Sequence, residues 1–172
     1  MKEIKFRKLK AEEIEVKVGS KSKPESKKQY IDLLLYKTAR TDMDILDETV
    51  GHNNWQNYYE TVKDNLYCII EIWDEDKKQW IKKSDCGVES AFGDKQKGEA
   101  SDAFKRAGFR CGIGRELYSS PHIRLWEGSF KPFEKYFVDK ITYKNGKIDG
   151  LKIVNQNGDV VFTQKPTVKD SE

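Results

Sequence analysis

The sequence is poor in the residues that build disulfide frameworks and metal sites. Its 172 residues include three cysteines and two histidines. The cysteines Cys68, Cys86 and Cys111 are an odd number without a close pair, which is atypical of a disulfide-stapled secreted domain and favours a reducing compartment. No Cys-x-x-Cys spacing occurs, so a structural zinc site is not expected.

Long apolar segments are missing as well. No stretch approaches the roughly 18 apolar residues that a membrane-spanning helix needs. The first ten residues are rich in charge and contain no apolar segment typical of a signal peptide. These absences predict a cytoplasmic protein that does not associate with membranes.

Motifs of the common catalytic and cofactor-binding sites are also absent. The chain has no phosphate-binding P-loop, and Gly112-Ile113-Gly114 lacks the further glycines of a dinucleotide fingerprint. His52 and His122 are isolated in the sequence, and no serine stands in a Gly-x-Ser-x-Gly elbow. We therefore expect a protein that is not an enzyme and that needs neither a cofactor nor a metal ion.

Charge, by contrast, is abundant and unevenly placed. Charged residues make up 35% of the chain, above the usual fraction of roughly 25%. The 32 basic and 29 acidic residues give a net charge of +3. Six basic and two acidic residues fall between Lys95 and Arg115, so this segment carries +4 and the remainder sums to −1.

Hydrophobic periodicity predicts a single α+β domain. Strands are expected over 13–18, 30–36, 56–63, 66–73 and 79–84, helices over 38–50 and 95–111, and further strands over 137–143, 148–154 and 160–164. Asn145-Gly146 and Asn157-Gly158 are typical of type I′ hairpin turns between these last strands. The expected architecture is an antiparallel β-meander packed on a helix, a β-β-β-α core, with a preceding helix and a C-terminal β-hairpin or meander extension. The core would span about 13–120, the extension about 121–164 and a polar tail 165–172.

The helix predicted over 95–111 is the strongest candidate for a binding site. It presents cations on a rigid rod, and Asp102 lies three and four residues before Lys105 and Arg106, close enough to orient them. Aromatic residues alternate with lysines elsewhere, as in the segment 79–83. Cations beside aromatic rings suit single-stranded nucleic acid, whose bases stack on rings with about 1–3 kcal/mol each. The alternative is a solvated helix face that only maintains solubility.

Two segments resemble a known family. The string GEASDAFKRAGFRCGIGRELY, residues 98–118, resembles the second-helix motif of the Rad-fifty-two superfamily of single-strand annealing proteins, particularly its phage and bacterial members. The string ARTDMDILDETVGHNNWQ, residues 39–56, resembles the first helix of that family. The resemblance covers about residues 13–120 and implies a β-β-β-α core that assembles into homo-oligomeric rings or filaments, with single-stranded DNA in a basic groove.

The resemblance also assigns roles to residues. Lys105 and Arg106 match the helix cations that hold the DNA backbone. Many relatives have an arginine where this chain has Phe109, and Arg110 stands one place later. Arg40 lies near a further basic position of the family. The full set of expected DNA-binding residues is Lys95, Lys97, Lys105, Arg106, Arg110, Arg115 and Arg40.

The function implied is ATP-independent binding of single-stranded DNA and annealing of complementary strands in phage-type recombination and DNA repair, in the cytoplasm of a bacterial host. Its partners would be single-stranded DNA, further copies of the chain, and a phage or host exonuclease or single-strand binding protein. Two alternatives remain. One is a protein that coats single strands or DNA ends without pairing them. The other is a small metal-dependent nuclease that uses Asp74, Asp76, Asp85 or Glu89.

Overall fold

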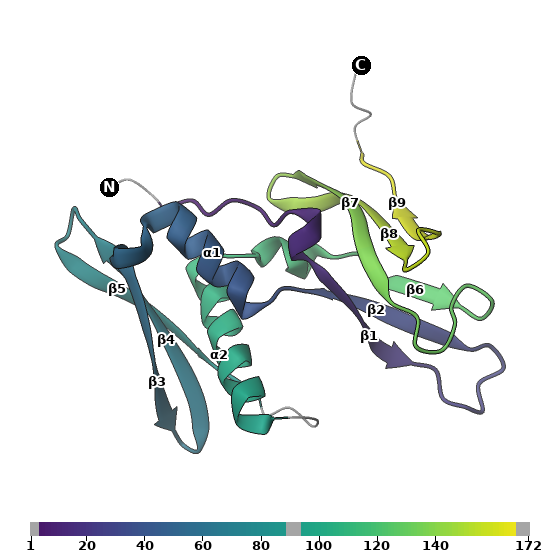
Figure 1. The fold of residues 1–172 in the computed structure, drawn as a ribbon, viewed down its shortest axis with the longest axis horizontal. Helices are drawn as coiled ribbons and strands as arrows, with labels where there is room; N and C mark the ends of the chain where they lie inside the picture. The colour runs from purple at the N-terminus through teal and green to yellow at the C-terminus, as the bar shows by residue number, and fades with distance from the viewer. Residues whose placement is uncertain (1–3, 89–93, 168–172) are drawn as a thin grey trace. The chain divides into compact units, whose positions relative to one another are not determined.

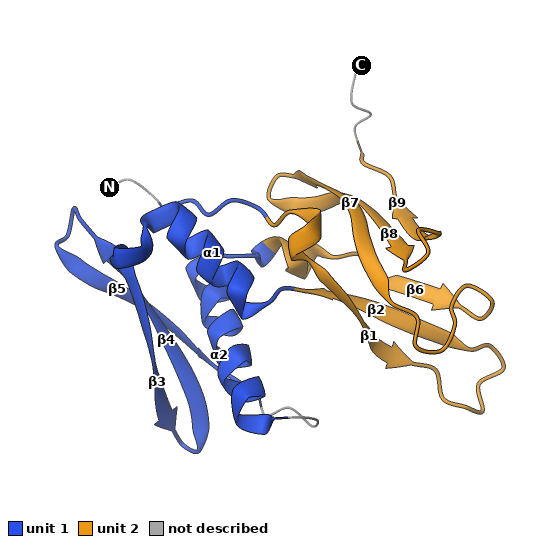
Figure 2. Cartoon of the chain, in the orientation of Figure 1, with its two compact units in different colours: residues 1–8, 37–115 blue, residues 9–36, 116–172 orange. Residues whose placement is uncertain are grey.

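A computed structural model of the chain describes residues 4–88 and 94–167 (Figure 1). The fold is α+β, as predicted, with two α-helices and antiparallel strands. The chain forms two compact units (Figure 2). Unit 1 comprises residues 1–8 and 37–115, and unit 2 comprises residues 9–36 and 116–172. The chain therefore passes from one unit to the other three times, and each unit contains segments that are distant in sequence.

Unit 1 is a three-stranded antiparallel sheet with helices against it. Its elements are α1 (Ala39–Val50), the 3-10 turn η2 (His52–Asn54), β3 (Trp55–Val62), β4 (Asn65–Asp74), β5 (Gln79–Cys86) and α2 (Lys95–Cys111). The strand order is β3-β4-β5. Helix α2 packs on β4 and β5, and α1 contacts both α2 and β3 (Figure 1).

Local signals define both helices. The Thr38 hydroxyl accepts the backbone N–H of Thr41 at the start of α1, and the Asp94 carboxylate accepts that of Lys97 at the start of α2. Such caps satisfy backbone donors that have no partner inside the helix. Helix α2 ends at Gly112, whose φ of +114° belongs to the left-handed region that glycine adopts freely. The predicted helix over 95–111 is confirmed at both ends.

The interior of unit 1 combines small residues on α2 with aliphatic residues on the sheet. Ala103 and Ala107 are buried, so the helix axis approaches the sheet closely. The fully buried Phe104 lies against the Trp55 ring, with centroids 6.1 Å apart. The middle strand β4 turns an apolar face inward, because Cys68, Ile70 and Ile72 are all buried.

Unit 2 is a six-stranded sheet with the order β6-β2-β1-β7-β8-β9. Its elements are η1 (Ala11–Glu13), β1 (Glu15–Lys21), β2 (Tyr30–Tyr36), η3 (Arg115–Ser119, of which Arg115 belongs to unit 1), β6 (Ile123–Trp126), β7 (Tyr136–Lys144), β8 (Lys147–Asn155) and β9 (Val160–Gln164). The outermost strands β6 and β9 contact each other, so the sheet curls around its own interior. That interior is formed mainly by Leu9, Ile31, Leu33, Ile123, Leu125, Val138, Leu151 and Ile153.

The sheet of unit 2 differs from the expected division of the chain near residue 120. Strands β1 and β2 were expected within the core over 13–120, but they pair with β7 and β6 and share a sheet with the C-terminal strands. The four strands after residue 120 therefore belong to one six-stranded sheet with β1 and β2 and are not an appended meander. The physical reason is that β2 alternates Ile31 and Leu33 into the same interior as Ile123 and Leu125 of β6.

The two predicted hairpin turns differ from each other. Asn145 and Gly146 both have positive φ, as the predicted type I′ turn requires. At the second turn Gly158 has a φ of +86°, whereas Asn157 is not in the left-handed region. The type I′ prediction is wrong there, because the Asn155 side chain accepts the backbone N–H groups of residues 157 and 159 and holds a longer connection.

Candidate nucleic-acid interface

Two guanidinium groups of α2 converge on one carboxylate of the sheet. Arg106 Nε lies 3.6 Å from Asp85 Oδ1, and Arg110 Nε donates to Asp85 Oδ2 at 3.0 Å. The two arginines are four residues apart, so they lie on the same side of the helix. Asp85 stands near the end of β5, which runs against α2. The arginine side chains remain 45% and 64% exposed, whereas the aspartate side chain is 15% exposed.

Lys105 lies on a different flank of α2. Consecutive residues of an α-helix are about 100° apart around its axis, so Lys105 cannot share the direction of Arg106. Its ammonium lies 3.7 Å from Asp102 Oδ1, and its side chain is 24% exposed. The pairing with Asp102 predicted from spacing is confirmed for Lys105, while Arg106 turns to Asp85 instead.

The other expected DNA-binding residues are spread along the unit. Lys95 and Lys97 are exposed in the first turn of α2, about 20 to 22 Å along the axis from Arg110. Arg40 is exposed in the first turn of α1. Arg115 donates to the carbonyl oxygens of Phe109 and Arg110, both at 2.7 Å, so it caps the end of α2.

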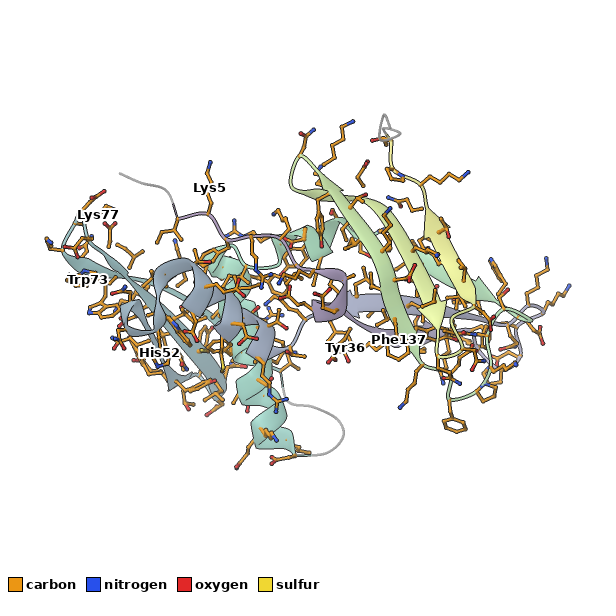
Figure 3. The ribbon with its side chains drawn as sticks, turned by 45° about the horizontal axis from the view of Figure 1, so that its top comes forward. Lys5, Tyr36, His52, Trp73, Lys77 and Phe137 are labelled. Carbon is orange, nitrogen blue, oxygen red and sulfur yellow. The ribbon has the colours of Figure 1, made fainter. Side chains whose placement is uncertain are left out.

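A hollow of about 770 Å³ opens beyond the C-terminal end of α2. Arg110 and Arg115 line it together with Lys83 of β5 and Lys77 of the β4–β5 hairpin. Its apolar lining comes from Ile4, Phe6, Val50, Ile72, Trp73, Ile81 and Cys111. Figure 3 labels Trp73 and Lys77 on this hairpin. Lys83 was not among the expected DNA-binding residues, and strand alternation could have added it, because it lies on the same sheet face as Ile81 and Asp85.

Acidic residues of the β4–β5 hairpin turn accept hydrogen bonds from neighbouring residues and so stabilise the turn. Asp74 accepts the backbone N–H groups of Asp76 and Lys77, both at 3.1 Å, and these bonds lower the pKa of its carboxyl group. Glu75 pairs with Lys78, which lowers the Glu75 pKa, and accepts the Trp73 indole N–H. These acids belong to a hydrogen-bonded turn, although they also line the hollow.

A buried ion pair lies beneath the middle of α2. The Lys37 ammonium pairs with Asp42, and neither side chain is exposed to solvent. Lys37 also donates to the Lys105 carbonyl oxygen at 3.2 Å and lies 4.1 Å from the centre of the Phe109 ring. Burial raises the pKa of Asp42 to about 6, against the opposing effect of Lys37. The pair links α1 to the helix segment that carries the predicted cations.

Gly108 is required by this pair. A Cβ atom at residue 108 would collide with Asp42 Oδ2. The glycine in the string KRAGF is thus explained by the close approach of α1. Sequence reasoning missed the pair, because a lysine and an aspartate five residues apart look like surface charges.

The ligand set expected for the nuclease alternative is not assembled in the described part of the chain. Residues 4–88 and 94–167 contain no group of three His, Cys, Asp or Glu side chains placed to hold a metal ion. Asp85 is taken up by two arginines, and Glu89 lies outside the described residues. Within the same residues, neither helix is long and apolar enough to cross a lipid bilayer.

Comparisons with known proteins add no assignment. No protein-family model matches the chain, and no curated protein or solved structure is significantly similar to it.

Proposed function

We propose that the chain binds single-stranded DNA along α2 and anneals complementary strands without nucleotide hydrolysis. The observation that carries the proposal is the pair of exposed guanidinium groups, Arg106 and Arg110, on one side of α2 and facing one carboxylate. The resemblance of residues 98–118 to the second helix of single-strand annealing proteins supports it. In this proposal the order β3, β4, β5, α2 corresponds to the β-β-β-α core of that superfamily.

The chemistry of the arginines suits a phosphate backbone. A guanidinium group donates two parallel hydrogen bonds to a phosphate as readily as to a carboxylate. A phosphate that reaches Arg106 and Arg110 therefore competes with Asp85 for the same donors. Contacts of this kind position a strand without reading its sequence, so the base edges stay free to pair.

Annealing itself needs no energy source. Stacking supplies about 1.4 kcal/mol for each base-pair step, so pairing of complementary strands is strongly favourable. The obstacle is repulsion between two polyanions, which cations on the protein reduce. The modest net charge of +3 would allow the duplex product to leave. Further copies of the chain in a ring or filament would extend the DNA-binding surface, in phage-type recombination beside an exonuclease or a single-strand binding protein.

The test is an energy-transfer assay with two complementary dye-labelled oligonucleotides, without ATP or metal ions. The wild type should accelerate pairing, and the Lys105→Ala/Arg106→Ala variant should pair strands at the spontaneous rate. The control is Lys140→Ala/Lys147→Ala, which removes the same charge from exposed positions of unit 2. Far-UV circular dichroism and thermal melting confirm that both variants are folded.

Three results would contradict the proposal. If the α2 variant pairs strands as fast as the wild type, the site is wrong. If the wild type binds single strands tightly without accelerating pairing, the protein is a coating protein. If labelled DNA is degraded when Mg²⁺ or Mn²⁺ is added, and Asp85→Ala abolishes the degradation, the nuclease alternative holds.

A further inference from the structure

The outer face of unit 2, which is the face of its sheet opposite the interior, carries two aromatic rings against one guanidinium group. Tyr30 of β2 pairs with Trp126 of β6, and their rings meet edge to face with centroids 5.7 Å apart. The Arg124 guanidinium carbon lies 3.7 Å from the centre of the Tyr30 ring and 5.6 Å from that of Trp126. Trp126 is 49% exposed, so much of its indole surface is open to solvent.

A network of hydrogen bonds fixes the Arg124 guanidinium group against these rings. Arg124 donates to both oxygens of Asp32, at 2.7 and 2.9 Å, which fixes the plane of the guanidinium group. Ser20 donates to the same carboxylate at 2.7 Å, and His122 Nε2 lies 3.0 Å from it. These contacts, the Arg124 guanidinium first, hold the pKa of Asp32 well below its usual range. Tyr30, Asp32, Arg124 and Trp126 therefore form an ordered platform, from which the Trp126 ring is exposed to solvent.

Lysines gather beside the platform. The connection from β1 to β2 lies next to it, because Ser22 N–H donates to the Tyr30 carbonyl oxygen and Glu127 N–H donates to that of Gln29. The Gln29 side chain donates to three carbonyl oxygens of this connection, at residues 23, 24 and 26, and so orders it. Four exposed lysines and one glutamate lie between residues 21 and 28, namely Lys21, Lys23, Lys27, Lys28 and Glu25.

The same outer face continues with further rings. Tyr36 of β2 and Phe137 of β7 both lie opposite Glu15 of β1, the strand between β2 and β7, and Figure 3 labels both rings. Phe137 is half exposed, and the Lys17 ammonium lies 4.8 Å from the centre of the Tyr36 ring. Aromatic surface and cations therefore alternate along this face.

We propose that this face of unit 2 is a second contact for single-stranded DNA. An unpaired base stacks on Trp126, and the lysines of residues 21–28 contact the flanking phosphates. Rings that accept bases of any sequence, beside cations that follow the backbone, form the common chemistry of single-strand binding surfaces. The proposal rests on the proposed function, since it takes single-stranded DNA as the ligand, but it concerns a different unit of the chain.

The test measures the affinity of the full chain for a fluorescent oligonucleotide by anisotropy. Trp126→Ala should weaken binding about 5- to 150-fold, the range expected for the loss of one stacked base, and Trp126→Phe should weaken it less. Phe133→Ala is the matched control, because this ring is fully exposed in the same unit and should leave affinity unchanged. On an oligonucleotide of abasic sites the effect of Trp126→Ala should vanish, because no base remains to stack.

The outcomes separate this inference from the proposed function. If Trp126→Ala binds within twofold of the wild type while the α2 variant loses binding, the second contact is wrong and the proposed function stands. If Trp126→Ala weakens binding while the α2 variant does not, the inference stands and the site on α2 is wrong. If the wild type binds no single-stranded DNA, both are overturned. Equal losses for Trp126→Ala and Phe133→Ala would also contradict the inference.

Discussion

The two units each contain a lysine or arginine paired with an aspartate, and the surroundings give these pairs opposite properties. In unit 1, Lys37 and Asp42 are completely buried, and burial raises the pKa of Asp42. In unit 2, Arg124 and Asp32 lie at the surface, and the guanidinium group lowers the pKa of Asp32. Two buried charges have lost their hydration, which their attraction barely offsets, whereas the surface pair keeps part of its hydration. The same kind of ion pair can therefore make the fold sensitive to a single substitution when it is buried, or order surface side chains when it is exposed.

The largest expected effect comes from breaking the buried pair of unit 1. Lys37→Met should lower the free energy of unfolding by about 3–5 kcal/mol, because it leaves Asp42 buried without a cation. The Lys37→Met/Asp42→Leu variant should recover most of that loss, since no charge remains to be desolvated. Urea unfolding at pH 7 measures both, and a double variant no more stable than the single one would show that the pair itself is needed.

The pH dependence of the same variants is the next largest effect. The folded chain holds a proton on Asp42 up to a higher pH than the unfolded chain, so this group stabilises the fold at low pH. The free energy of unfolding should fall as the pH rises from about 4 to about 6. The decrease should extend to higher pH in Lys37→Met, because the cation that opposes the shift is gone. Lys37→Met/Asp42→Leu should show no such decrease, and equal slopes in all three proteins would contradict this assignment.

A smaller effect is expected from the surface pair of unit 2. Arg124→Met should lower the free energy of unfolding by at most about 1 kcal/mol, because both partners keep contact with water. Replacement by methionine preserves much of the apolar contact with the Tyr30 ring. Urea unfolding of this variant, followed by hydrogen exchange of the backbone amides of each unit, would test the comparison directly. A loss as large as that of Lys37→Met would show that exposure does not explain the difference.

Elements that local signals define could be predicted from the sequence, whereas pairings between distant segments could not. Helix α2 and the strands of the meander follow from local signals, namely apolar spacing, an aspartate cap and a terminal glycine. The partners of β1 and β2 do not, because pairing with β6 and β7 depends on a shared interior formed by residues about 90 to 120 positions away. The two hairpin turns were predicted from their Asn-Gly dipeptides. The type I′ prediction was wrong at Asn157-Gly158, because the Asn155 side chain accepts backbone N–H groups of that loop.

The candidate site was predictable to a similar degree. Local charge density selects α2 as a basic segment, and its cations are exposed to different extents. Sequence spacing cannot show that Arg106 and Arg110 share Asp85, because that carboxylate comes from a different element, β5. It also cannot show that Arg115 donates to the carbonyl oxygens of Phe109 and Arg110 at the end of α2.

The smallest expected effect concerns Asp85 and its two arginines on α2, whose side chains are more exposed than that of Arg124. Asp85→Asn removes the carboxylate that competes with phosphate for Arg106 and Arg110 and preserves its shape. If the arginines bind DNA, single-strand affinity should rise, by up to about fivefold at low salt, which corresponds to a surface ion pair of up to about 1 kcal/mol. The dependence of affinity on salt should also steepen, since more cations become available to release counterions. Asp139→Asn is the matched control, because Asp139 forms a comparable exposed pair with Lys152 in unit 2. Unchanged affinity in Asp85→Asn, or an equal gain in Asp139→Asn, would mean that phosphate does not reach these two arginines.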